Sequence, residues 1–424
     1  MLGIKTKIQN SKLYYKYWEI PRIERLHNHV ISAIRKKNVA NVLFIASNLP
    51  MWRYQNLFTI LNSDLRFNAK ILLVPFAGPI AEQENSLERL RAYFDKLKIP
   101  YIDTTLPEYS NLNVRKDFSP DIMFYQQPYG DSYDCNKYEC IHFYDKLLCY
   151  YPYSHWMIKE PFGYNTRYHN LAWKIFQSDI VNYRNAQEMA YNNASNVVVV
   201  GAPNADNFLR NEFNDVWKIK DRSIKRIIWA PHFTIFPSTG TYVTHSCFLE
   251  IAENMLSLAK DYTDKIQIAF KPHPELKTRL YQHPNWGKKR ADLYYEEWDK
   301  ISNGQLEDGD YIDLFMTSDA MIHDCSSFTI EYHFTNNPVL FISKDIDAFR
   351  STLNEVGKDA IDLHYKATGI EEIKAFIDNV VLFGKDRKSE DRSEYIRRYL
   401  IPPFGKTVAE NTYNDIVKSL FEQD

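Results

Sequence analysis

The 424-residue chain is 45% hydrophobic and 25% charged, with a formal net charge of −2. This composition excludes a disordered or fibrous protein, and it excludes the excess of positive charge that sequence-independent nucleic-acid binding requires. A chain of this length favours two domains over one.

The first half of the chain alternates short apolar runs with helical segments. A basic, aromatic-rich helical lead-in over residues 1–37 comes first, and it suits either a membrane surface or a solvated helix packed on the first domain. The predicted strands are Asn41–Ala46, Lys70–Pro75, Ile99–Asp103, Asp121–Tyr125, Lys174–Asp179 and Asn196–Val200, with helices near 53–64 and over Leu87–Leu97. Strand–helix–strand repetition of this kind predicts a doubly wound parallel sheet.

The alternation restarts after a charged stretch, Asn211–Arg226. Strands are predicted at Arg226–Ala230, Lys265–Phe270, Asp319–His323 and Val339–Ile342, and helices at Phe248–Lys260, near 310–317, from Ser326 and at Val408–Phe421, with a polar, aromatic excursion over 275–309. Two Rossmann-like halves predict an α/β fold of GT-B architecture. The expected parts are the lead-in 1–37, an N-terminal Rossmann-like domain 38–210, a C-terminal Rossmann-like domain 211–395 and a helix crossing back over 396–424. Neither Gly-x-Gly-x-x-Gly nor a Walker-type loop occurs, which disfavours a dehydrogenase or a kinase.

The five cysteines include no Cys-x-x-Cys pair, which argues against a disulfide framework and a structural zinc site. The first twenty residues lack the apolar core of a secretory signal, and no run approaches the length that spans a bilayer. We therefore expect a protein of the reducing cytoplasm, one that is peripheral if it acts at a membrane.

Polar clusters follow three predicted strands of the second half, where ligands bind in open α/β sheets. Lys271-Pro272-His273-Pro274 places a cation and an imidazole between prolines, which suits a phosphate or a leaving group but also an ordinary surface turn. Asp324-Cys325-Ser326-Ser327 opens a helix, as an anion site or as a simple N-cap. Trp229–Thr234 contains His232, which lines a donor pocket or serves as a structural histidine. Glu331, one turn into the helix, faces a ribose hydroxyl or solvent.

In this order, the clusters resemble the CDP-glycerol:poly(glycerophosphate) glycerophosphotransferases of teichoic-acid and capsule synthesis. Members of that family carry a Tyr-Ala-Pro-Thr-like strand end, then Lys-Pro-His-Pro, then a Thr-Asp-Tyr-Ser-Ser segment that opens a helix containing Asp-Tyr. Lys-Pro-Ile or Lys-Pro-Val then precedes an apolar strand, and a Gly-x-Pro-Arg-x-Asp turn lies upstream of all of these. The corresponding segments here are Trp229–Thr234, Lys271–Pro274, Met321–Ser327 with Glu331-Tyr332, Asn337–Phe341 and, upstream, Gly201–Asp206.

The resemblance implies transfer of a polyol phosphate from a CDP-activated donor, without a metal or another cofactor, to a polysaccharide or lipid-linked polymer. On the matching positions, His273 would contact the donor diphosphate or assist the departing CMP. Lys271 would neutralise charge, and Ser326 and Ser327 would cradle the diphosphate. The remaining donor-side candidates are His232, Asp324 and Glu331.

The family's base lies in a Trp-His-Gly-Thr-Pro-Leu-Lys segment of the N-terminal domain, and here the equivalent stretch is Tyr150–Trp156 with Lys159 behind it. His155 is the candidate for the base that deprotonates the acceptor hydroxyl, and His169 is its rival. The glycine and threonine of the motif are missing. The acceptor-side candidates are Gln127, Tyr129, Tyr153 and Lys159, of which the first two lie in a loop directly after a predicted strand.

Two other functions fit the same sequence. A GT-B glycosyltransferase or sugar-nucleotide epimerase would bind a nucleotide sugar at the same strand ends. A degenerate homologue without catalysis would explain the altered Trp-His-Gly segment.

Overall fold

The computed structural model describes residues 11–77, 80–129, 132–133, 135–236 and 246–422 of the chain. The described chain divides into two compact units, the first formed by residues up to Asp206 together with Ile401–Asp424, and the second by Asn207–Leu400. The α/β fold expected from the sequence is confirmed in both units. The units divide at 206/207 and 400/401, whereas the sequence places the domain limits at 210/211 and 395/396.

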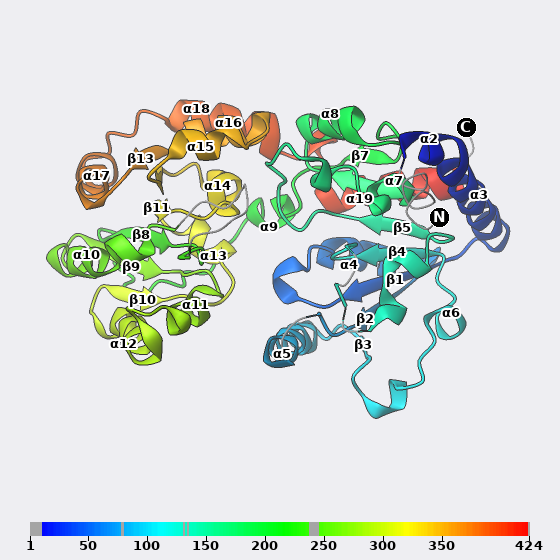
Figure 1. The fold of residues 1–424 in the computed structure, drawn as a ribbon, viewed down its shortest axis with the longest axis horizontal. Coiled ribbons are helices and arrows are strands. Elements are labelled where there is room, and N and C mark those ends of the chain that lie inside the picture. Colours follow the sequence, from blue (N-terminus) through cyan, green and yellow to red (C-terminus); the bar gives the residue numbers. More distant parts are fainter. Residues whose placement is uncertain (1–10, 78–79, 130–131, 134, 237–245, 423–424) are drawn as a thin grey trace, which may run out of the picture. The chain divides into compact units, whose positions relative to one another are not determined.

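The first unit contains a seven-stranded parallel sheet in the order β3-β2-β1-β4-β5-β6-β7 (Figure 1). Its strands are β1 (Ala40–Ala46), β2 (Phe67–Leu73), β3 (Ile102–Asp103), β4 (Ile122–Tyr125), β5 (Leu147–Tyr150), β6 (Lys174–Gln177) and β7 (Val197–Val199). Its main helices are α2 (Lys12–Tyr14), the π-helix η1 (Tyr15–Glu19), α3 (Ile20–Lys37), α4 (Gln55–Ser63), α5 (Ile80–Leu97), α6 (Val114–Asp117), α7 (Arg167–Leu171), α8 (Ile180–Met189) and α19 (Val408–Phe421). Short 3-10 turns lie at Leu49–Met51, Pro107–Tyr109, Asn136–Tyr138, Cys140–His142, Pro161–Gly163 and Pro403–Gly405.

Alternating side chains of the first sheet pack on two different layers, as a doubly wound sheet requires. Phe44 of β1 lies against Phe58 of α4 and stacks on Phe124 of β4, with ring centroids 5.7 and 4.6 Å away. Its neighbours Leu43 and Ile45 belong to the other layer, which includes Ile23 of α3. Both faces of the sheet are therefore covered.

The second unit contains a six-stranded parallel sheet in the order β10-β9-β8-β11-β12-β13. Its strands are β8 (Lys225–Ala230), β9 (Ile266–Phe270), β10 (Gly304–Leu306), β11 (Ala320–His323), β12 (Val339–Ile342) and β13 (Tyr365–Ala367). Its helices are α10 (Phe248–Asp261), α11 (Leu276–Gln282), α12 (Gly287–Lys300), α13 (Ile312–Met316), α14 (Phe328–Glu331), α15 (Ile346–Ser351), α16 (Glu355–Asp362), α17 (Ile370–Phe376) and α18 (Ser389–Tyr395), with η7 (Tyr332–Thr335), η8 (Ile377–Leu382) and η9 (Ile396–Leu400); α9 (Ala205–Phe208) lies at the start of the unit.

In this sheet β8 and β11 are neighbours from which the chain winds outward in both directions. That position is the topological switch point, where open α/β sheets bind ligands beyond the carboxyl ends of their strands. The same relation holds for β1 and β4 in the first sheet. The order of the strands therefore determines which of the polar segments that follow them lie next to each other.

The excursion expected over 275–309 is instead ordered as α11, α12 and β10. The buried side chains of α12 recur at helical spacing (Ala291, Tyr294, Tyr295 and Trp298) and join the core on one face of the sheet. The helix expected from Ser326 to Phe334 is α-helical only over Phe328–Glu331. It then tightens into the 3-10 turn η7, which ends at Asn336 in the left-handed region (φ 56°).

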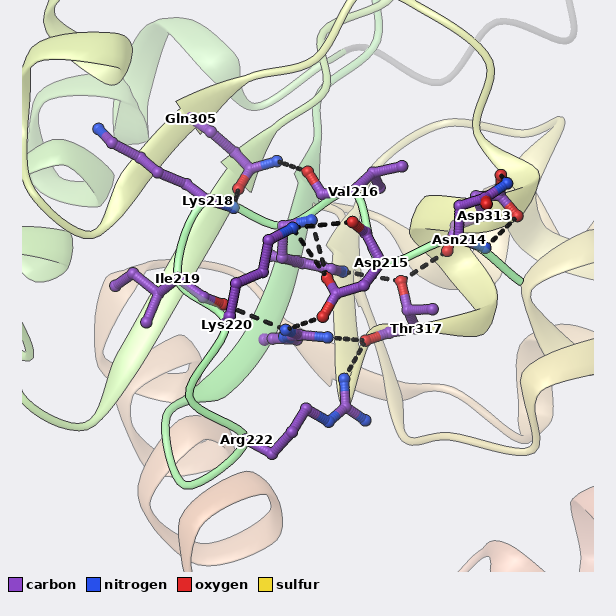
Figure 2. A network of polar contacts seen from close by, with 12 residues as sticks. Asn214, Asp215, Val216, Lys218, Ile219, Lys220, Arg222, Gln305, Asp313 and Thr317 are labelled. Carbon is purple, nitrogen blue, oxygen red and sulfur yellow. Dashed lines mark hydrogen bonds and ion pairs between the residues drawn. The ribbon is translucent and has the colours of Figure 1, made fainter. Parts of the chain in front are cut away.

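The segment that enters the second unit is fastened near the amino ends of the strands (Figure 2). Asp215 accepts a hydrogen bond of 2.7 Å from the guanidinium of Arg226, whose side chain is 1% exposed. The backbone N–H of Lys218 donates to the side chain of Gln305 in β10 at 2.7 Å. Since this network lies at the opposite edge from the switch point, it anchors the segment and leaves the carboxyl edge to other residues.

The predicted helical lead-in is helical from Lys12 to Lys37, and its first ten residues lie outside the described part. Across the described residues, no helix combines the length and the apolar character that a bilayer crossing demands.

Candidate functional site

The carboxyl edge of the second sheet brings three predicted segments together. The backbone N–H of Lys271, after β9, donates to the carbonyl of Trp229 in β8 at 2.8 Å, and that of His273 donates to Pro231 at 3.0 Å. On the other side of β8, the N–H of His232 donates to Asp324, after β11, at 2.6 Å. The segments therefore lie side by side at the switch point, because their strands are neighbours.

Asp324 holds this edge together from beneath. The residue is 2% exposed. Its carboxylate accepts hydrogen bonds from the N–H of His232, from the hydroxyl of Ser246 at 2.7 Å and from the N–H of Cys247 at 2.8 Å. Burial raises the pKa of Asp324 to about 6, although these donors act in the opposite direction. The contacts tie the loop after β8 and the start of α10 to β11.

The rings of His232 and His273 lie 5.0 Å apart, edge to face. The Nδ1 atom of His273 accepts a hydrogen bond of 3.2 Å from the backbone N–H of Glu275. Burial lowers the pKa of His273 to about 4 against the opposing effect of Glu275, and it lowers the pKa of His232 to about 3. At neutral pH His273 is therefore an uncharged imidazole with its proton on Nε2, which makes Nε2 a hydrogen-bond donor.

Lys271 and Glu331 are both buried and hydrogen-bonded. The ammonium of Lys271 donates to the carbonyl of Gly309 at 2.8 Å. Burial raises the pKa of neighbouring Glu307, although Gln305 and Lys271 act in the opposite direction. Glu331 is 5% exposed and accepts a hydrogen bond of 2.6 Å from the hydroxyl of Tyr311. Of the two interpretations of Glu331 from the sequence, the solvated carboxylate is wrong.

Ser326 is half-buried and Ser327 is exposed at the start of α14. The side chain of Ser327 makes no capping bond and instead lies 3.0 Å from the thiol of Cys325. The simple N-cap is therefore wrong for this serine. Because α14 is a single turn, its dipole adds little, and the hydroxyls themselves are the groups that this turn offers to a ligand.

In the first unit, His155 follows β5 and is buried against the next strand end. Its Nε2 atom lies 2.7 Å from a carboxylate oxygen of Asp179, which follows β6. The two side chains are 2% and 4% exposed. Its rival His169 is also buried, with Nδ1 2.8 Å from the hydroxyl of Thr166, and burial lowers the pKa of His169 to about 4.

The acceptor-side candidates occupy different environments. Tyr129, after β4, lies 3.2 Å from the hydroxyl of Tyr150 and stacks on Phe162 with centroids 5.0 Å apart. Two candidates contribute only main-chain carbonyls to the described hydrogen bonds: Gln127 accepts from Tyr133, and Tyr153 from Arg53. Lys159 forms an exposed ion pair of 3.0 Å with Glu188. Of these four candidates, Tyr129 is the one whose side chain has both a hydrogen-bond partner and a ring contact among the described residues, and it follows β4, the neighbour of the strand that precedes His155.

A comparison with protein-family models matches the CDP-glycerol:poly(glycerophosphate) glycerophosphotransferase model to residues 160–397. The chain belongs to this family. The resemblance stated from the strand-end motifs is thereby confirmed. A comparison with curated protein sequences finds no match.

The following solved structures have the same fold. A UDP complex of S. aureus MnaA aligns with a TM-score of 0.57 at 14% identity, over 91% of this chain and 99% of that chain. A putative UDP-N-acetylglucosamine 2-epimerase from Listeria monocytogenes gives 0.58 at 14% identity, over 91% and 98%. A variant of the wall teichoic acid polymerase TagF gives 0.56 at 14% identity, over 96% and 97%. At this identity the matches establish the GT-B fold alone, and the expected architecture is confirmed.

Sequence reasoning missed Asp179, the partner of His155. It follows β6 directly and caps α8 by accepting a hydrogen bond of 2.8 Å from the N–H of Asn182. The signal was present in the sequence, since a Ser-Asp pair between an apolar run and a helix marks both a strand end and an N-cap. Among the residues that the structure describes, no group of three or more His, Cys, Asp or Glu side chains is arranged to hold a metal ion.

Proposed function

We propose that this family member transfers glycerol phosphate or ribitol phosphate from a CDP-activated donor to a hydroxyl of a teichoic-acid-like or capsule polymer, releasing CMP. One observation carries the proposal. At the switch point of the second sheet the ring of His273 lies against that of His232, and the backbone of His232 is bonded to Asp324, where the Asp324–Ser327 turn begins, in a chain of the glycerophosphotransferase family. A TagF variant of the same fold was soaked with CDPG, which agrees with a CDP-activated donor here.

The proposed chemistry needs a base on the acceptor and donors on the departing phosphate. The acceptor oxygen attacks the phosphorus that carries the polyol, the bond from that phosphorus to the CMP oxygen breaks, and the hydroxyl proton passes to His155. Negative charge grows on the phosphate oxygens during this step. The Nε2–H of His273, the hydroxyls of Ser326 and Ser327 and the ammonium of Lys271 are the groups assigned to that charge.

The remaining assignments are supportive. Asp324 and His232 hold the donor edge in place through the hydrogen bond that joins them. Glu331, held by Tyr311, is assigned to the ribose of the donor, and Tyr129 to the acceptor polyol, since its stacked ring and hydroxyl offer both an apolar face and a donor.

A nucleotide-sugar enzyme is the second candidate, because structures of UDP-N-acetylglucosamine 2-epimerases align with this chain about as well as TagF does. A binding and turnover panel of CDP-glycerol, CDP-ribitol and UDP-N-acetylglucosamine separates the two. We expect a CDP-polyol to raise the thermal midpoint and to yield CMP in the presence of a polyol-phosphate primer. Stabilisation by the UDP-sugar alone would refute the proposal, and tight binding of a CDP-polyol without CMP release from any primer would indicate a non-catalytic homologue.

We also propose that the lead-in helix associates with an anionic membrane surface. Leu13, Tyr17 and Trp18 are 67%, 63% and 72% exposed, and the exposed cations Lys12 and Lys16 lie between and beside them. Apolar rings beside cations favour the interface of anionic bilayers. Co-sedimentation with vesicles containing phosphatidylglycerol should fall in Trp18→Ser and in high salt, and binding that is equal for neutral and anionic vesicles would contradict the idea.

A further inference from the structure

The His155–Asp179 contact joins two loops that follow neighbouring strands of the first sheet. The ring nitrogen Nε2 lies 2.7 Å from the carboxylate, and the side chains are 2% and 4% exposed. At such a short contact the carboxylate decides which role the imidazole nitrogen takes. An ionised carboxylate can only accept a hydrogen bond, whereas an imidazole nitrogen can donate or accept.

The carboxylate of Asp179 is itself fixed by a chain of hydrogen bonds. It accepts from the backbone N–H and the side-chain amide of Asn182 at 2.8 and 2.7 Å. The hydroxyl of Tyr164 donates to the amide oxygen of Asn182 at 2.6 Å, and Asn185 donates to that hydroxyl at 3.3 Å. Burial raises the pKa of Asp179, but the bonds from His155 and Asn182 outweigh it and leave the pKa below its usual range. Asp179 is therefore a charged acceptor.

An ionised Asp179 requires the proton of His155 to lie on Nε2. The other nitrogen, Nδ1, then carries a lone pair, and it is buried with no hydrogen-bond partner among the described residues. Leaving a buried polar atom without a partner costs about 1–3 kcal/mol. Nδ1 of His333 is also without a partner among the described residues, but its Nε2 lies 3.1 Å from the carbonyl of Ala360, whereas Nε2 of His155 lies against a carboxylate. A histidine that only tethered its loop would gain nothing from this arrangement.

We propose that Asp179 is the positioning residue of the acceptor side: it fixes the tautomer of His155 so that Nδ1 is the nitrogen that takes the acceptor proton. Asn182 and Tyr164 extend this support by holding the carboxylate. The inference rests on the proposed function, because it needs a base in the first unit. After the proton arrives, the imidazolium bears N–H groups on both nitrogens, and the carboxylate stabilises its charge.

Two substitutions test the role while preserving the cap of α8. Asp179→Ser keeps a capping hydroxyl but is too short to reach His155, and Asp179→Asn keeps the size but removes the charge. In both, we expect kcat for CMP release to fall by about 10²–10⁴, as when the aspartate of a catalytic triad is replaced, while KM for the donor stays within about two-fold. Asp345→Asn is the control, because Asp345 caps α15 through the N–H of Ala348 at 2.9 Å and lies in the second unit.

Nitrogen-15 NMR of the histidine rings gives a readout that activity does not supply. In the unsubstituted protein the His155 proton should reside on Nε2, and in Asp179→Ser a substantial share of it should move to Nδ1. A proton on Nδ1 in the unsubstituted protein, or unchanged kcat in both variants, would overturn the assignment. If no CDP-polyol is turned over at all, the proposed function fails instead, and the spectrum still decides the tautomer.

Discussion

Replacing His273 tests the donor edge most directly, because its two ring nitrogens have separate tasks. Nδ1 accepts the N–H of Glu275 at 3.2 Å, so Nε2 carries the proton that we assign to a donor phosphate oxygen. His273→Ala removes both. We expect kcat to fall by about 10²–10³, the usual effect of losing one donor to developing negative charge. The loss of one hydrogen bond and of ring contacts with His232 and Phe233 should lower the free energy of unfolding by only about 2 kcal/mol.

Two further variants separate the tasks. His273→Asn retains an acceptor for the Glu275 N–H but has no donor at the Nε2 position, whereas His273→Gln can reach that position with an amide N–H. Release of CMP from CDP-glycerol, followed with donor affinity by calorimetry, should show Gln more active than Asn. His283→Ala is the matched control, since His283 Nδ1 also accepts a backbone N–H, from Asn285 at 3.3 Å, after a helix rather than a strand. Near-normal kcat in His273→Ala would refute the assignment.

Three other perturbations follow from the described contacts. Asp215→Ala should lower the free energy of unfolding of the second unit by about 2–4 kcal/mol, because it leaves the buried charge of Arg226 without its carboxylate. Lys220→Ala removes an exposed ion pair at 3.7 Å and should change that free energy by less than about 1 kcal/mol. Equal effects of the two variants in chemical denaturation would contradict the reasoning. Gly163→Ala should lower the free energy of unfolding by about 1–3 kcal/mol and reduce kcat. The added Cβ would lie 2.2 Å from Nε1 of Trp156, in the loop that carries His155, so that this loop would have to shift. A variant as stable and active as the original would contradict the role assigned to that loop. Acidification from about pH 6.5 to pH 4 should lower the thermal midpoint, because the unfolded chain binds more protons than the folded chain over this range. The cause is burial, which depresses the pKa of seven histidines: His27, His169, His232, His273, His323, His333 and His364. A midpoint that stays constant over this range in calorimetry would show that these pKa values are not depressed.

Apolar runs bounded by polar residues were sufficient to predict most strands of both sheets. β1, β4, β8 and β9 were predicted within a residue or two, because a strand buried on both faces is continuously apolar. β13 was missed because it has three residues, of which only Ala367 is buried. α12 was missed although its buried aromatic residues recur at helical spacing, since the charged run Lys288–Arg290 obscured the stripe.

The sequence also predicts some features of the candidate site and not others. On the second unit, the residues that meet are fixed by main-chain bonds between neighbouring strand ends, so that a short motif after each strand predicts its place. The motif could not show which nitrogen of His273 is protonated, because the N–H of Glu275 that decides this belongs to the local backbone geometry. Nor could it show that Glu331 is buried, which depends on Tyr311 from another helix.

On the first unit, the family motif points to His155 as the proposed base but gives no sign of its partner, Asp179. What equips His155 is a carboxylate 24 positions further along the chain, brought beside it because β5 and β6 are neighbours. A glycine or threonine next to the histidine shapes its loop, but the proton transfer itself needs only a ring and a partner that sets its tautomer. The altered Trp-His-Gly segment is therefore weak support for a non-catalytic homologue. The family match begins at residue 160, so Asp179 falls inside the matched region and His155 falls outside it. Exchanging the loop that carries His155 for a family-type Trp-His-Gly-Thr loop should thus preserve CMP release as long as Asp179 stays, and should fail to rescue Asp179→Ser.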